Sequence, residues 1–175
     1  MVGSFSLSES EFQARASEFC RKRAENKPLF HSRLGIGQEG YVWETLAGSA
    51  IKVFERRGNF EDELKCYQIL KDFEITKIHA FNVPCLLDWS DDLRVIEMTI
   101  VKPPFILDFG KARLYFKPEY PTDAVDYHER QMEETFGEWL PQVENALAYL
   151  ESLGIYYVDA NLRNIKVDGL PPPEQ

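Results

Sequence analysis

A lysine on an apolar strand, shortly after a glycine-rich loop, is the feature of this sequence that most restricts its fold. The loop has the pattern Gly-x-Gly-x-x-Gly over residues 35–40, and glycines let the backbone approach phosphate groups closely. Residues 41–46 follow it and are rich in β-branched and aromatic types, which are typical of a strand. A dinucleotide-binding fold needs a helix after the third glycine. The sequence therefore favours a glycine-rich hairpin, which either covers phosphates or is an ordinary turn.

The lysine is Lys52, and it lies in the apolar run of residues 50–54. If it points inward it needs an anionic partner, because burying an unpaired charge is costly; if it points outward it needs none. Residues 60–73 have a helical pattern and carry three acidic side chains, at positions 61–63. Among these, Glu63 shares a face with apolar residues and is the best partner for Lys52. The alternative is that all three are solvated and stabilised by the helix dipole.

Hydrophobic periodicity predicts the remaining elements. Helices are predicted over residues 9–25, 60–73, 122–136 and 139–153, and strands over residues 31–34, 41–46, 50–54, 86–89, 93–101, 156–158 and 165–167. Ser8 and Glu11 have the spacing of a capping box, and Gly154 is expected to end the last helix. Because most strands come before most helices, the fold class expected is α+β.

Composition excludes several classes of protein. A net charge of −9, from 29 acidic and 20 basic residues, argues against nucleic acid as a partner. No run of apolar residues is long enough to span a membrane, and no signal pattern opens the sequence. The cysteines and histidines do not have metal-ligand spacing, so we expect no structural metal site and a cytoplasmic protein with reduced thiols. These residues are Cys20, Cys66, Cys85, His31, His79 and His128.

Taken in order, these motifs resemble those of the protein-kinase superfamily. Residues 34–42 resemble the glycine-rich loop over ATP, and residues 50–52 resemble the strand with the phosphate-positioning lysine. Glu63 matches its helix partner. Residues 95–99 resemble the strand that enters the adenine-binding hinge. Further matches are the long helix below the active site and the run into the catalytic loop, at residues 142–150 and 153–159. The resemblance covers roughly residues 34–167 and implies a kinase-like fold with an antiparallel N-lobe sheet and a reduced helical C-lobe.

The resemblance also implies ATP and Mg²⁺ as cofactors and assigns roles to residues. It makes Asp159 and Lys52 the catalytic residues and Asn164 the metal ligand. The nucleotide-binding residues that it implies are Gly35, Gly37, Gly40, Val42, Lys52, Glu63, Glu97 and Met98.

The sequence departs from the kinase pattern in and after the catalytic loop. Tyr157 and Val158 replace the usual His-Arg, and Asn161 stands where many protein kinases have a lysine. Only 11 residues follow Asn164, so the activation segment and the metal-binding Asp-Phe-Gly are missing from their usual place. We therefore expect a truncated or minimal member of the superfamily.

Two aspartates are candidates for the missing metal ligand. Asp168 would need a sharp turn to reach a metal ion shared with Asn164, and we expect it to start a turn with Gly169 instead. Asp108 opens an Asp-Phe-Gly tripeptide that lies before the catalytic loop. Either the site is rearranged and Asp108 supplies the metal contact, or the tripeptide is an ordinary turn just past the hinge. Its position in the sequence favours the turn and predicts a place away from Asn164.

We expect one kinase-like domain. It would comprise an N-terminal helical extension (residues 1–30), an N-lobe and hinge (31–101), a minimal C-lobe (102–170) and a tail (171–175). The function expected is binding of ATP and Mg²⁺ with weak phosphotransferase activity. The alternative is a catalytically inactive, pseudokinase-type interaction module. A small-molecule kinase is less favoured, because the chain has little room for an acceptor pocket. Some aromatic residues either cover surface that a missing lobe would bury or bind a protein partner, including a second copy: Tyr115, Phe116, Tyr120, Tyr127, Phe136 and Trp139.

Overall fold

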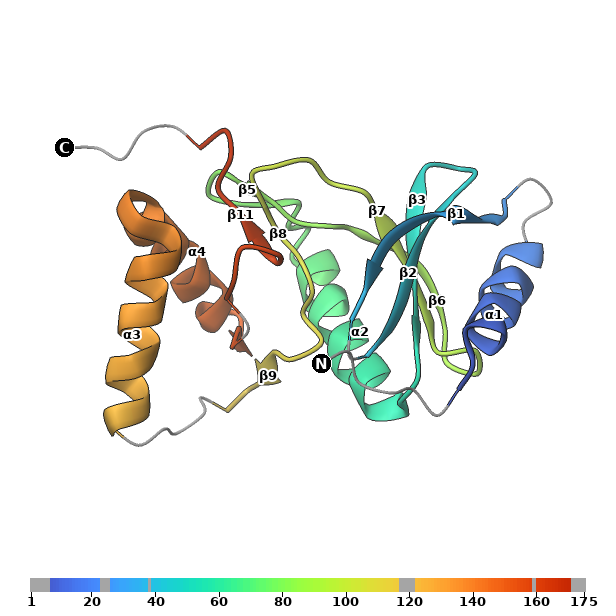
Figure 1. Ribbon diagram of the computed structural model, residues 1–175, viewed down its shortest axis with the longest axis horizontal. Coiled ribbons are helices and arrows are strands. Elements are labelled where there is room, and N and C mark those ends of the chain that lie inside the picture. Colours follow the sequence, from blue (N-terminus) through green and yellow to red (C-terminus); the bar gives the residue numbers. More distant parts are fainter. Residues whose placement is uncertain (1–6, 23–25, 38, 117–121, 159, 171–175) are drawn as a thin grey trace. The chain divides into compact units, whose positions relative to one another are not determined.

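The computed structural model describes residues 7–22, 26–37, 39–116, 122–158 and 160–170, which form two compact units (Figure 1). The first unit comprises Met1–Lys65 and Cys85–Ile100, and the second comprises Cys66–Pro84 and Val101–Gln175. Helix α2 (Arg57–Asp72) contributes its first part to one unit and its last part to the other. The two units therefore interleave along the chain.

The first unit is built on a five-stranded antiparallel sheet. In spatial order its strands are β1 (Pro28–Ile36), β2 (Gly40–Thr45), β3 (Ser49–Phe54), β7 (Val95–Thr99) and β6 (Leu86–Ser90). Each coincides with a strand-like run of the sequence. The observed β1 is longer than the predicted strand because its pairing with β2 continues, through two register shifts, as far as Ile36.

Helix α1 (Glu9–Arg21) packs on one face of this sheet (Figure 1). The helix starts as the capping-box spacing predicts: the side-chain hydroxyl and the backbone N–H of Ser8 both donate to Glu11 and lower the pKa of that carboxyl. The buried side chains between helix and sheet are Phe12, Ala16, Phe19, Cys20, Tyr41, Trp43, Ile51, Val53 and Val95. Because successive strand residues point to opposite faces, this helix covers one set of side chains and leaves the alternate set, which includes Lys52, on the other face.

The second unit contains α3 (Thr122–Phe136) and α4 (Leu140–Ser152), both in predicted helical regions. A 3₁₀ turn (Gly137–Trp139) joins them, and its first two residues were not predicted to be helical. As predicted, Gly154 follows the end of α4, with a φ of 79° that suits glycine. No helix among the described residues is long and apolar enough to cross a membrane. The mixture of an antiparallel sheet with helices confirms the α+β class.

Short strands complete the second unit. β4 (Lys77–Ile78), β5 (Phe81–Asn82), β8 (Phe105–Ile106) and β11 (Ile165–Lys166) form a sheet in the order β11-β8-β5-β4. A separate pair joins β9 (Arg113–Leu114) to β10 (Ile155–Tyr156). Four of these strands, β4, β5, β8 and β9, were not predicted, because two residues are too few to show a periodicity of two.

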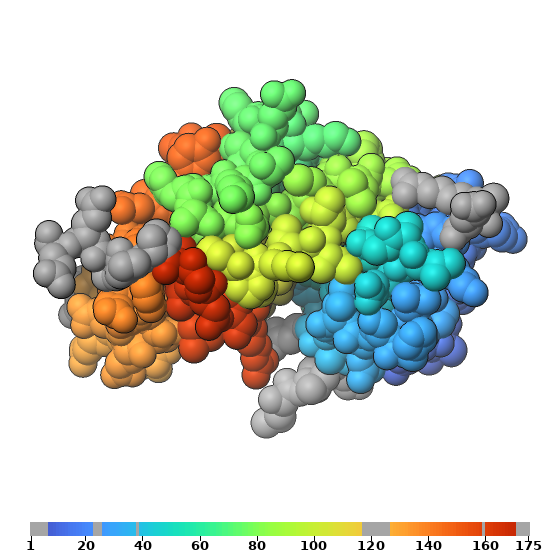
Figure 2. Space-filling model, turned by 90° about the horizontal axis from the view of Figure 1, so that it is seen from above, coloured from blue at the N-terminus to red at the C-terminus, as the bar shows by residue number. Residues whose placement is uncertain are grey.

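Pairing of β8 with β11 brings together two distant parts of the sequence. Ile106 lies opposite Ile165, and Phe105 lies opposite Lys166, in antiparallel register. Figure 2 shows the red C-terminal residues lying against the yellow segment that contains β8. The chain just after β8 therefore lies beside the chain just before β11, and this contact places two of the candidate site residues.

Candidate functional site

Three of the predicted nucleotide-binding residues form one row across the first sheet. Gly35 of β1 lies opposite Val42 of β2, which lies opposite Lys52 of β3. Directly opposed residues of antiparallel strands point to the same face. This row is on the face that α1 does not cover, and Val42 is only partly buried. The sheet thus presents a glycine, a small apolar side chain and a cation side by side.

Lys52 points inward and pairs with Glu63, as predicted. Its Nζ donates to Glu63 Oε2 over 2.6 Å and to Glu39 Oε2 over 3.3 Å. The ammonium group also lies 4.9 Å from the centre of the Phe54 ring, within the range of a cation–π contact. All three charged side chains are at least nine-tenths buried. The first unit therefore contains a buried lysine held by two carboxylates.

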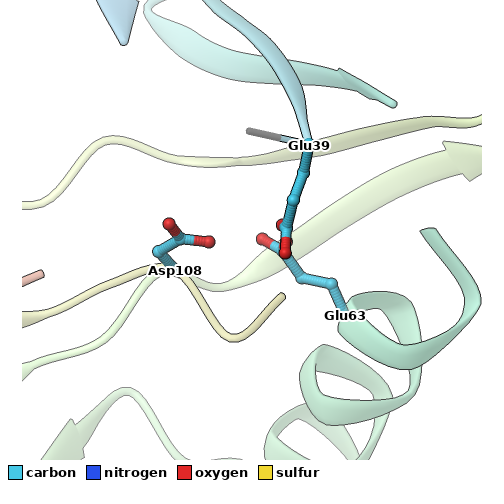
Figure 3. A group of neighbouring side chains, drawn as sticks. All are labelled: Glu39, Glu63 and Asp108. Atoms are coloured by element: carbon cyan, nitrogen blue, oxygen red, sulfur yellow. The ribbon is translucent and has the colours of Figure 1, made fainter. Parts of the chain in front are cut away.

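Glu39 is the member of this cluster that was not predicted. It belongs to the glycine-rich loop just before β2, whereas Glu63 belongs to α2. Figure 3 shows the carboxylates of Glu39 and Glu63 directed toward one another; it also labels Asp108, which belongs to the second unit. A glutamate between loop glycines has no periodic context that predicts its burial, so only the structure identifies this second partner of Lys52.

Gly40 fixes the loop onto the neighbouring strand. A Cβ atom at this position would lie 1.9 Å from the backbone oxygen of Val53. The backbone N–H of Glu55 donates to the oxygen of Glu39 over 3.0 Å, and Gly37 donates to the oxygen of Gly40 over 3.1 Å. The third glycine is therefore required here for close backbone packing.

Gly40→Ala should destabilise the protein by about 1–3 kcal/mol, because the methyl group would overlap a backbone atom that cannot rotate away. Urea denaturation of both proteins measures this difference. Gly35→Ala is the matched control: its Cβ would meet only Val42 side-chain atoms at 3.9 Å, and its effect should stay within about 0.5 kcal/mol. Equal unfolding midpoints for the two variants would contradict this account of the loop.

The two predicted residues of β7 differ in orientation. Met98 lies opposite Ala50, on the same face as Lys52, and is buried. Glu97 lies opposite Ile51, so its side chain points to the α1 face. There it accepts a hydrogen bond of 2.6 Å from the Ser49 hydroxyl. A direct contact of the Glu97 side chain with a nucleotide at Lys52 is thus not supported, and only its backbone remains a candidate.

In the second unit, Asn164 ends a tight turn. Its N–H donates to the backbone oxygen of Asn161 over 3.0 Å, and the Asn161 side chain accepts from the N–H of Arg163 over 2.9 Å. Asn164 is 9% exposed and directly precedes β11. Asn161, where many kinases have a lysine, thus has a structural role that holds the turn before Asn164. Asp159 lies outside the described residues.

The expectation that the Asp-Phe-Gly tripeptide lies away from Asn164 is wrong. The N–H of Leu107 donates to the backbone oxygen of Asn164 over 2.7 Å, and Asp108 is the next residue. The cause is the pairing of β8 with β11, which continues as far as this hydrogen bond. Asp108 has a left-handed backbone, with φ of 59°, which turns the chain away from the strand direction. By contrast, Asp168 is exposed and forms a turn with Gly169, as predicted.

A cluster of three aromatic rings holds this tripeptide in place. Phe109 is fully buried, and its ring makes edge-to-face contacts with Tyr67, at 5.4 Å between centroids, and with Tyr157, at 5.7 Å. The Tyr157 hydroxyl donates to the backbone oxygen of Leu107. The tyrosine that replaces the usual histidine therefore supports the residue just before Asp108.

The aromatic residues proposed as a cover or interface are not alike. Phe136 is buried in the second unit, whereas Tyr115, Phe116 and Tyr127 are exposed. Trp139 is partly buried, and Tyr120 lies outside the described residues.

Together, the five-stranded antiparallel sheet, the helix after the lysine strand and the ion-paired lysine define an α+β fold with a buried cation on one face of its sheet. No family model matches the chain, and no curated protein matches it. Similar solved structures include the streptomycin–ATP–APH(2″)-IIa ternary complex, at 14% identity with a TM-score of 0.40, covering 86% of this chain and 39% of that one. The gentamicin–APH(2″)-IIa complex has 17% identity, a TM-score of 0.37 and coverages of 86% and 39%. ADP-bound aminoglycoside phosphotransferase APH(2″)-Ib has 16% identity, a TM-score of 0.38 and coverages of 90% and 42%. The chain spans about two fifths of the length of these proteins.

Proposed function

We propose that this chain binds ATP with Mg²⁺ and acts as a kinase-like phosphotransferase. The observation that carries the proposal is the buried Lys52–Glu63 ion pair, which lies on the sheet face that α1 leaves uncovered. A lysine held in this way by a helix carboxylate is fixed in direction. An oriented ammonium group in a buried setting suits an anionic ligand such as a polyphosphate.

The first unit would bind the nucleotide. Lys52 would donate to phosphate oxygens, and the loop that includes Gly35, Gly37 and Gly40 would approach them with its backbone. Val42 and Met98 share the Lys52 face and would provide an apolar contact for the base. Catalysis of phosphoryl transfer depends mainly on positioning and on stabilising charge, and these are the contributions that this arrangement of residues can make.

The second unit offers oxygen ligands for Mg²⁺. Asn164 carries an amide oxygen and Asp108 a carboxylate, and hard oxygen donors are those that Mg²⁺ prefers. Asp108 directly follows Leu107, whose N–H donates to the backbone oxygen of Asn164, so the chain brings two residues with oxygen donors close together, and these residues fit the ion. When bound, Mg²⁺ would neutralise charge on the phosphates. The kinase resemblance further suggests that Asp159 orients or deprotonates an acceptor hydroxyl.

Calorimetric titration with ATP, with and without Mg²⁺, tests the proposal. Wild type should bind in a Mg²⁺-dependent manner. Lys52→Ala should bind about tenfold to a hundredfold more weakly, because a charge-assisted hydrogen bond to phosphate is lost. Lys71→Ala, which removes an exposed lysine from α2, is the matched control and should bind like wild type.

Lys52→Ala also leaves two buried carboxylates without their cation, so its fold must be checked by circular dichroism. If it unfolds, the double variant Lys52→Gln/Glu63→Gln replaces the ion pair by two neutral amides and serves in its place. ATP binding that is the same in wild type and in a folded Lys52 variant would refute the proposed site.

A catalytically inactive interaction module is the second candidate, and one observation favours it. The Glu39 carboxylate already lies on Lys52, where a phosphate would have to bind. If this module is correct, Asp159→Asn leaves cellular function intact, whereas replacing exposed aromatic residues such as Phe116 abolishes it. Phosphotransferase activity lost in Asp159→Asn would exclude it.

A further inference from the structure

The two carboxylates on Lys52 are not equivalent. Glu63 Oε2 lies 2.6 Å from Nζ, a short charge-assisted hydrogen bond, whereas Glu39 Oε2 lies at 3.3 Å. Glu63 is anchored on helix α2, and its side chain is 1% exposed. Glu39 lies in the glycine-rich loop directly before β2, and Gly37 of the same loop is exposed. Of the two, Glu39 is therefore the partner that can be displaced.

Two carboxylates share the Lys52 ammonium group. All three charged groups are almost fully buried. Close like charges that are shielded from water repel one another strongly. A triphosphate that approached Lys52 would bring further negative charge to the same point. Phosphate and the Glu39 carboxylate thus compete for one cation.

The backbone around Glu39 shows how the competition can be resolved. Its carbonyl oxygen accepts from the N–H of Glu55, and the next residue, Gly40, is packed against the backbone oxygen of Val53. The main chain at this point is therefore held against β3. Displacement of the carboxylate needs a change of side-chain rotamer at Glu39, without opening of the loop.

We propose that Glu39 is a built-in competitor for the phosphate site: its carboxylate holds Lys52 when no nucleotide is bound and must swing away before the phosphates can bind. This inference rests on the proposed function, since it assigns a regulatory residue to the same nucleotide site. Competition from the Glu39 carboxylate would make the affinity for ATP weaker than Lys52 alone would allow. The glycine-rich loop, which carries Glu39, would then be the element that sets this affinity.

Calorimetric titration of Glu39→Gln with ATP and Mg²⁺ tests the proposal. The glutamine keeps nearly the same shape but removes the competing charge, so ATP should bind about tenfold more tightly than to wild type. Inorganic triphosphate should show the same gain, because the competition concerns phosphate and not the base. Glu61→Gln is the matched control: it neutralises an exposed glutamate on α2, and both affinities should stay as in wild type.

The outcomes separate this inference from the proposed function. If wild type binds ATP through Lys52 but Glu39→Gln binds equally well or more weakly, Glu39 is not a competitor; weaker binding would make it a ligand of the bound metal or nucleotide. If neither protein binds ATP or triphosphate, the proposed function and this inference both fail. Glu39→Ala, which removes the carboxylate altogether, serves as the second variant if Glu39→Gln does not fold, and the same gain in affinity is expected from it.

Discussion

Asp108→Asn should lower phosphoryl transfer by at least about a hundredfold while leaving the fold intact. Loss of a residue that only supports a metal ligand already lowers metal affinity or activity 10- to 100-fold in many metal sites. Asp108 is proposed as a ligand itself, so its loss should cost at least as much. The amide keeps the shape of the carboxylate but removes the negative charge that Mg²⁺ requires. ATP hydrolysis or autophosphorylation, measured over a range of Mg²⁺ concentrations, should show lower turnover and a higher Mg²⁺ requirement.

Asp168→Asn is the matched control for this prediction. Asp168 is an exposed aspartate in the turn with Gly169, two residues past β11, and its replacement should change neither turnover nor the Mg²⁺ requirement. Turnover that survives in Asp108→Asn but is lost in Asp168→Asn would reverse the assignment. It would show that the chain uses Asp168, which follows Asn164, and not Asp108.

Phe109→Ala should destabilise the protein by about 3–5 kcal/mol, the range for removing a fully buried phenylalanine. The ring fills the space between Tyr67 and Tyr157, and its loss leaves a cavity that rings on two separate segments cannot easily fill. Urea denaturation followed by fluorescence measures the change. Since stabilities of single proteins are commonly about 5–15 kcal/mol, this single variant should unfold at markedly lower denaturant concentration.

Phe116→Ala provides the comparison for Phe109. Phe116 is a nearby phenylalanine of the same unit that is 80% exposed, and its removal should change stability by less than about 0.5 kcal/mol. Equal losses of stability in the two variants would show that the cluster of aromatic rings around Phe109 does not hold the second unit together.

The lysine pair could be predicted because it is local. The strand with Lys52 and the helix with Glu63 follow each other directly, and both have clear periodicity. Once the strand is recognised, the cost of burying an unpaired ammonium group requires an acidic partner nearby. The structure confirms this pair and the α+β class that the order of strands and helices predicted.

The position of Asp108 could not be predicted because it depends on a non-local contact. Strands β8 and β11 have two residues each, too few to show alternation. The sequence position of the tripeptide, just past a hinge-like strand, indicated a place far from Asn164. Only the pairing of Ile106 with Ile165 overrides that expectation.

The orientations of Glu39 and Glu97 needed structural information of another kind. Whether Glu97 shares a face with Lys52 depends on the register between β7 and β3, and a shift by one residue would reverse it. The burial of Glu39 depends on how the glycine-rich loop folds over β3. Neither the orientation of Glu97 nor the burial of Glu39 is encoded in a local sequence pattern. A motif can therefore identify the right segment without identifying which of its side chains lie on the Lys52 face.

The pairing of β8 with β11 also sets an order of assembly during synthesis. Lys52 and Glu63 are both available once the first third of the chain has emerged from the ribosome, and neighbouring elements form quickly. Asp108 is made next, but the strand that places Asn164 beside it comes only after α3 and α4 have been completed. A growing chain would thus form the Lys52–Glu63 pair early and bring the two proposed metal ligands together later. If the proposed function is correct, phosphate transfer would begin only after β11 has joined the sheet.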